Sequence, residues 1–119
     1  MKIVDLNMTT SASSSAANVT SSETIFGHIE KVVYTQSGAA AEADLTLTCE
    51  DIAIETILVK ANIGTAAAIF YPRTLPHKAA DGSTFTNVAD RFFVVGKLKA
   101  AIAEANTGAS IRVSVYLSD

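Results

Sequence analysis

Few residues in this sequence are suited to covalent, redox or metal chemistry. The chain of 119 residues has one cysteine, Cys49, and two histidines, His28 and His77. A single cysteine cannot form an intramolecular disulfide and leaves no pair for a zinc or redox motif. The histidines are far apart and show neither HxH nor HExxH spacing. We therefore expect no metal ion and no cofactor, and a fold stabilised by its core or by neighbouring subunits.

The motifs of common enzyme classes are missing as well. No glycine-rich segment leads from a strand into a helix, which excludes the P-loop and the dinucleotide fingerprint. No serine stands in a G-x-S-x-G motif, and Cys49 alternates with Leu45 and Leu47 as a core thiol would. Acidic residues are dense between positions 44 and 55, where solvated charges are the usual explanation. The sequence predicts that the chain is not an enzyme and has no small-molecule substrate.

An excess of positive charge is also lacking. Nine Lys and Arg residues against 12 Asp and Glu residues give a formal net charge of -3, so no broad basic field is available for nucleic acid. No segment approaches 18 uninterrupted apolar residues, and Asp5 stands where a signal peptide would be apolar. We expect no nucleic-acid partner, no membrane partner and synthesis in a reducing or redox-neutral compartment.

What the sequence does contain is alternating apolar residues. With 49% hydrophobic and 18% charged residues the chain should form one core. The clearest alternation covers residues 111–118, in which every second side chain is apolar. Shorter strand-like runs lie at 24–34, 44–50, 54–61, 66–71 and 91–95. We predict an all-β fold, either a β-sandwich or a small β-barrel.

Two assignments depend on neighbouring turns. Runs 54–61 and 66–71 are separated by a segment that contains Gly64, which predicts that they form a hairpin. Residues 97–105 have high helix propensity but can also alternate as a strand. We favour a strand because a good hairpin loop, 106–109, follows. The alternative is an α+β fold with one short helix near 97–105.

The N-terminal region differs from the rest of the chain in composition and periodicity. Residues 9–22 are rich in Ser, Ala and Thr and have no periodicity, which indicates a flexible arm. Residues 2–8 alternate like a lone strand, which could pair with a neighbouring subunit or lie on its own domain. We therefore divide the chain into an N-terminal strand and flexible arm, 1–22, and a single β-rich domain, 23–119. We expect deletion of residues 1–22 to spare the fold but weaken assembly.

Contact residues are predicted on the N-terminal strand, after one internal strand and on the last strand. Arg73 follows Tyr71 and Pro72 at a strand exit, and arginine is frequent at interface centres because it binds carboxylates and stacks on rings. The polar loop from 74 to 90 follows, and loops often carry function. The predicted interface residues are Ile3, Val4, Leu6, Tyr71, Arg73, His77 and Tyr116.

Four apolar segments form a recognisable series along the chain: Ile57–Val59, Phe70–Arg73, Phe92–Lys99 and Ile111–Leu117. Together they resemble small virion structural proteins of tailed bacteriophages, of the capsid decoration or cement type. The resemblance implies a protein made in the bacterial host cytoplasm that binds the capsid exterior as a dimer or trimer. It also implies that contacts with the major capsid protein stabilise the shell.

Two other functions stay open at this point. A neck, tail or fibre component of a virion would assemble into rings or rods. A carbohydrate-binding β-sandwich module would need an exposed aromatic platform, which is disfavoured because the sequence has no tryptophan.

Overall fold

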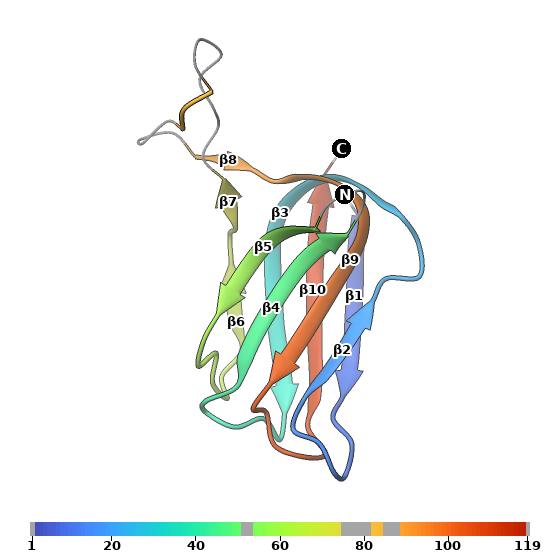
Figure 1. The fold of residues 1–119 in the computed structure, drawn as a ribbon, viewed down its shortest axis with the longest axis vertical. Coiled ribbons are helices and arrows are strands. Elements are labelled where there is room, and N and C mark those ends of the chain that lie inside the picture. Colours follow the sequence, from blue (N-terminus) through green and yellow to red (C-terminus); the bar gives the residue numbers. More distant parts are fainter. Residues whose placement is uncertain (1, 51–53, 75–81, 85–88, 119) are drawn as a thin grey trace.

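The computed structural model describes residues 2–50, 54–74, 82–84 and 89–118, and these form strands and no helix. Figure 1 shows two layers of strands that face each other. Antiparallel pairing orders the first layer as β1-β10-β3-β6 and the second as β2-β9-β4-β5. The predicted all-β fold class is confirmed.

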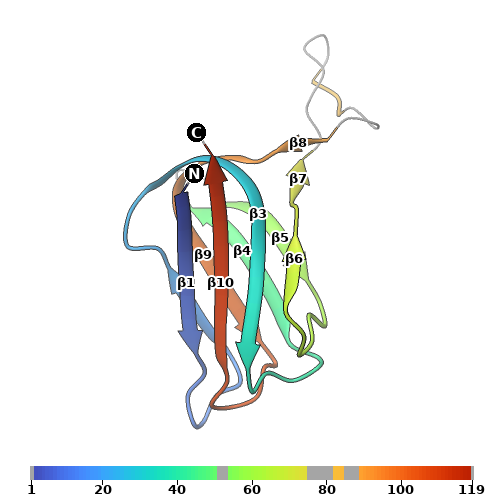
Figure 2. The ribbon, with the colours of Figure 1, turned by 180° about the vertical axis from the view of Figure 1, so that it is seen from behind.

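The first layer is the one nearer the viewer in Figure 2. Its strands are β1 (Lys2–Thr9), β10 (Ser110–Ser118), β3 (Ile25–Ser37) and β6 (Ala68–Phe70). The second layer consists of β2 (Ala17–Thr20), β9 (Phe93–Ala103), β4 (Asp44–Glu50) and β5 (Ile54–Lys60). A separate ribbon, β7 (Arg73–Thr74) paired with β8 (Asp90–Arg91), projects from one end (Figure 1).

The two layers are joined at a corner near the same end. The first four residues of β3, from Ile25 to His28, pair with Phe93–Gly96 at the start of β9. Farther along, β3 pairs with β10 and β6 in the first layer, while β9 pairs with β4 and β2 in the second. The corner therefore brings together side chains that are more than 60 positions apart in the sequence.

The core lies between the layers and follows the period of two in each strand. Alternate residues of β10 and β4 are fully buried, and β9 contributes its even-numbered side chains. The largest fully buried side chains are Tyr34, Leu6, Ile25, Ile29, Leu45, Leu47, Leu98, Ile102 and Leu117. The segment around 97–105 is a strand through Ala103, so the favoured prediction is confirmed and the helix alternative is wrong.

The predicted flexible arm is wrong over much of residues 9–22. Strand β2 pairs with β9, and the backbone N–H of Ala105 donates to the carbonyl oxygen of Ser15 over 2.9 Å. The N–H of Ser21 likewise donates to the Leu98 carbonyl over 2.8 Å. Backbone ladders need no bulky side chains, which is why a Ser/Ala/Thr-rich segment can be ordered. Strand β1 lies on its own chain, where it pairs with β10 over all eight residues.

The predicted hairpin between runs 54–61 and 66–71 is also wrong. Both runs contain strands, but β5 pairs with β4 in the second layer and β6 pairs with β3 in the first. The connection crosses between layers and is anchored by Tyr34, whose hydroxyl donates to the Gly64 carbonyl over 3.2 Å. Burial raises the pKa of this Tyr34 hydroxyl above its ordinary value of 10.0. Gly64 has the positive φ of 84° expected at a turn, but the chain passes from one layer to the other there and does not fold back beside β5.

Candidate interaction surfaces

The structure brings three of the predicted interface residues onto one row of the first layer. Ile3 lies opposite Tyr116, and Tyr116 lies opposite Lys31, across β1, β10 and β3. Tyr71 directly follows β6, whose register with β3 places it level with Lys31. Ile3 and Tyr71 are exposed, whereas the Lys31 ammonium lies 4.7 Å from the centre of the Tyr116 ring. The row is therefore partly apolar and partly covered by a cation–π contact.

Two other predicted contacts on β1 do not face outward. Leu6 is buried in the core of its own chain, so it has no surface to offer a partner and its assignment to an interface is wrong. Val4 is half-buried and packs against the same core. His77 lies outside the described residues.

Arg73 connects the β7–β8 ribbon to β3 by a hydrogen bond. Its Nη1 donates to the carbonyl oxygens of Pro72 (2.7 Å) and Glu30 (3.3 Å). The Glu30 carboxylate accepts a hydrogen bond from the Ser118 hydroxyl (2.6 Å) and forms an ion pair with Arg91. The Ser118 hydrogen bond, followed by the Arg91 hydrogen bond and the charges of Arg91 and Arg73, lowers the pKa of Glu30 below its ordinary 4.5.

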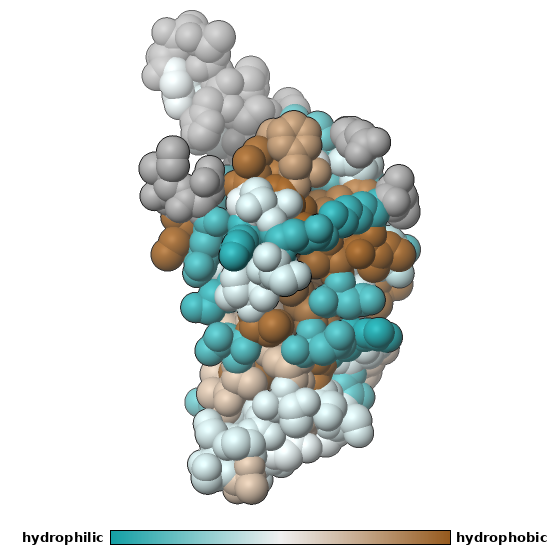
Figure 3. All heavy atoms as spheres, turned by 90° about the vertical axis from the view of Figure 1, so that its right-hand side faces the viewer, coloured by the Kyte–Doolittle hydropathy of each residue, from teal (hydrophilic) through white to brown (hydrophobic). Residues whose placement is uncertain are grey.

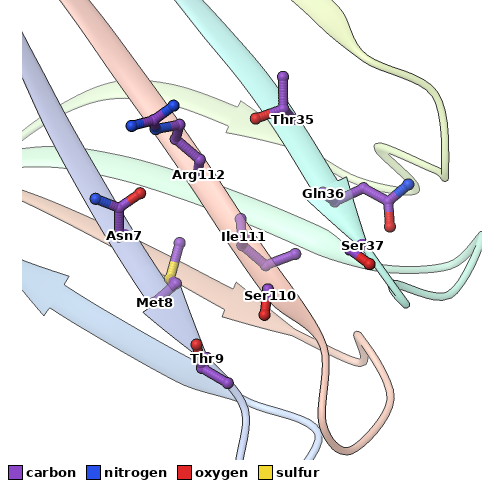
Figure 4. A pocket seen from close by; sticks show the side chains of 9 residues that line it. All are labelled: Asn7, Met8, Thr9, Thr35, Gln36, Ser37, Ser110, Ile111 and Arg112. Carbon is purple, nitrogen blue, oxygen red and sulfur yellow. The ribbon is translucent and has the colours of Figure 1, made fainter.

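A shallow groove of about 270 Å³ runs across the far end of the first layer (Figure 4). Two polar rows cross it, one made of Asn7, Arg112 and Thr35 and the other of Thr9, Ser110 and Ser37. The remaining lining residues are Met8, Gln36 and Ile111. Arg112 approaches Asp5 to 3.8 Å. The groove offers hydroxyl, amide and guanidinium groups to a polar partner, and none of its lining residues is a histidine, cysteine or carboxylate.

The described residues contain little that could perform chemistry. No group of three or more His, Cys, Asp and Glu side chains lies close enough to hold a metal ion in this part of the chain. Cys49 is buried. The ring of His28 lies edge-on against Phe93 with centroids 4.9 Å apart, and its buried Nδ1 has no hydrogen-bond partner among the described atoms.

An exposed apolar cluster, which we call the corner cluster, lies where β3 pairs with β9. It consists of Phe26, Phe93 and Val95, whose exposed fractions are 70%, 47% and 41%. Phe26 lies opposite Val95, and the two phenylalanine rings meet edge to face with centroids 5.1 Å apart. His28, opposite Phe93, borders the cluster.

Sequence reasoning missed the corner cluster, although a signal was available. Ile25 and Ile29 are core residues, so the alternation places Phe26 between them on the outer face. Phe92 and Phe93 are consecutive, so a strand must turn them to opposite sides. The pairing of β3 with β9, which brings these residues together, cannot be read from either strand alone.

Apolar surface is not spread evenly over the molecule. On the side seen in Figure 3, apolar side chains gather in the upper half among hydrophilic ones, while the lower end is mainly of intermediate hydropathy. Within the described part of the chain no helix has the length and apolarity needed to cross a bilayer.

No family model and no curated protein matches the chain. Two solved structures are similar to it. AlgX from Pseudomonas aeruginosa has a TM-score of 0.46 and 13% identity over 96% of this chain and 26% of its own. A chain of infectious bursal disease virus, Gx strain, has a TM-score of 0.36 and 6% identity over 97% of this chain and 32% of its own. The chain thus spans only part of the length of either neighbour, and similarity at this level assigns neither family nor function.

Proposed function

We propose that the chain is a structural protein of a virus particle that binds the capsid shell and stabilises it as a decoration or cement protein. The observation that carries the proposal is the corner cluster. Scattered apolar residues are normal on a protein surface, but contiguous exposed aromatic side chains mark interaction sites. Phe26 and Phe93 support each other in a fixed edge-to-face pair, so little side-chain entropy is lost when a partner covers them.

The arrangement of the aromatic rings favours a protein partner over a carbohydrate. A sugar ring stacks on an accessible aromatic face, and the ring of Tyr116 is covered by the Lys31 ammonium. The phenylalanines of the corner cluster meet at 85°, so they do not form a flat platform. They also carry no polar group to orient hydroxyls. A hydrophobic anchor inserted into a pocket of the major capsid protein suits this geometry better.

The experiment is co-sedimentation of the purified chain with shells assembled from the major capsid protein encoded in the same genome. We expect saturable binding at a fixed ratio of chain to capsid protein. The double variant F26S/F93S should weaken that binding by at least about tenfold, because buried aromatic anchors carry much of an interface energy. The matched control is I69S, which removes an exposed apolar side chain from β6 and should leave binding unchanged.

The outcomes separate the proposal from its rivals. Binding to isolated neck, tail or fibre assemblies, and not to shells, would assign the chain to that other part of the virion. Binding to a glycan array and not to shells would reject the virion role. Shell binding that F26S/F93S leaves intact would show that another surface makes the contact.

A further inference from the structure

Strand β5 has one unpartnered edge. It pairs with β4 on one side, and no described strand pairs with the other side. Two of its large apolar side chains are strongly exposed, Ile54 at 71% and Val59 at 65%. A strand edge of seven residues without proline presents a row of backbone donors and acceptors that invites another strand.

A β-bulge controls which side chains of this edge share a face. The register with β4 shifts between Leu47 and Thr48, so that Leu58 and Thr56 face them and Ile57 is the extra residue. Glu55 lies opposite Cys49 and Lys60 lies opposite Leu45, both core-facing residues of β4. The bulge therefore turns Glu55 and Lys60 toward the same side of the sheet, although five positions separate them.

Neither of these charges is neutralised within the described part of the chain. The described ion pairs join Lys2 to Glu23, Arg91 to Glu30, Lys99 to Glu50 and Arg112 to Asp5. Glu55 and Lys60 are both exposed. They stand near opposite ends of the strand, one acidic and one basic.

We propose that β5 pairs antiparallel with β5 of a second copy of this chain and so continues the second layer across a homodimer. A twofold axis between Ile57 and Leu58 places Glu55 opposite Lys60 of the second copy. The same operation places Lys60 opposite the second copy's Glu55. Thr56 of each copy then lies opposite Val59 of the other. Because of the bulge, the two side chains of every opposed pair point to the same face of the continued sheet. The edge is self-complementary in charge and in side-chain direction, as an isologous interface requires.

This inference goes beyond the proposed capsid role and does not depend on it. The β5 edge and the corner cluster are different surfaces, formed by different strands. A dimer would present two corner clusters to a shell, and the dimer can form whether or not the shell is the partner.

The first measurement is sedimentation equilibrium of the full chain over a wide concentration range. We expect the mass to rise with concentration from 12.4 kDa toward twice that value. E55K places lysine opposite Lys60 at both ends, and K60E places glutamate opposite Glu55. Each variant should weaken dimerisation by about tenfold or more, since two attractive cross-strand pairs become repulsive.

The decisive test is an equimolar mixture of the two single variants. In a mixed dimer every opposed pair is again one lysine and one glutamate, so we expect a heterodimer to form where each variant alone stays monomeric. The double variant E55K/K60E should also dimerise. E42K reverses an exposed acidic residue in the turn before β4 and is the matched control, which should dimerise like the parent chain.

Amide hydrogen exchange tests the proposal on the unaltered chain, so that misfolding of a variant cannot affect the result. Amide hydrogen exchange of the unaltered chain should slow in β5 as concentration rises and stay constant in β1. A chain that remains monomeric at all concentrations overturns the proposal. So does a dimer that E55K leaves intact, or one whose added protection lies outside β5.

Discussion

Gly27 lies at the corner, where β3 passes close to the end of the neighbouring strand β10. Its φ is +148°, and a Cβ added there would lie 2.7 Å from the backbone carbonyl oxygen of Ser118. Since neither backbone can yield cheaply, we expect G27A to destabilise the fold by about 1–3 kcal/mol. Urea unfolding followed by circular dichroism measures the change. The control is G108A, which shares a positive φ but meets no atom within 4 Å. Equal losses of unfolding free energy in G27A and G108A would show that the strain of a positive φ alone is responsible.

Leu6 and Ile3 lie on the same strand and test whether β1 belongs to the core. Leu6 is buried among the first-layer strands, while Ile3 is half-exposed on the outer face. We expect L6A to cost about 2–5 kcal/mol of unfolding free energy, because it removes buried methyl groups and leaves a cavity. I3A should cost less than about 1 kcal/mol. Similarly small losses of unfolding free energy in L6A and I3A would show that β1 detaches from β10 in solution.

At the scale of elements, the β7–β8 ribbon is held to β3 and β10 through Glu30. The pKa of Glu30 is lowered in the folded chain, so its stabilising contacts are fully present above about pH 4.5. They are lost as the pH falls through the lower, folded pKa. An NMR titration should show Thr74 and Arg91 amide signals shifting with a midpoint below 4.5. In E30Q this transition should vanish. A midpoint at or above 4.5 would contradict the Ser118 and Arg91 contacts.

The sequence predicted strands better than it predicted their partners. Strand identity is local: alternation fixed β10 and β4, and the loop at 106–109 correctly favoured strand over helix for β9. Pairing is not local, because a backbone ladder carries no side-chain signature. This is why β5 and β6 were assigned to one hairpin and why β2, with small side chains, was assigned to a flexible arm.

At the scale of the whole molecule, the candidate surfaces were only partly predictable. Tyr71 and Tyr116 were chosen for their chemistry, and the register of four strands places them on one row with Ile3. The corner cluster was missed because β3 and β9 meet only in the folded chain. Self-complementarity of β5 was equally hidden, since it depends on a bulge that moves Glu55 and Lys60 to the same face.

The pairing of the first strand with the last has a consequence for how the protein is made. Among the described strands, β1 is hydrogen-bonded only to β10, and β10 separates it from β3. During translation β1 therefore leaves the ribosome about a hundred residues before its partner. Contacts of such sequence separation are slow to form. The apolar face of β1 cannot pair with β10 until then, and the first layer can close only when the end of β10 has emerged.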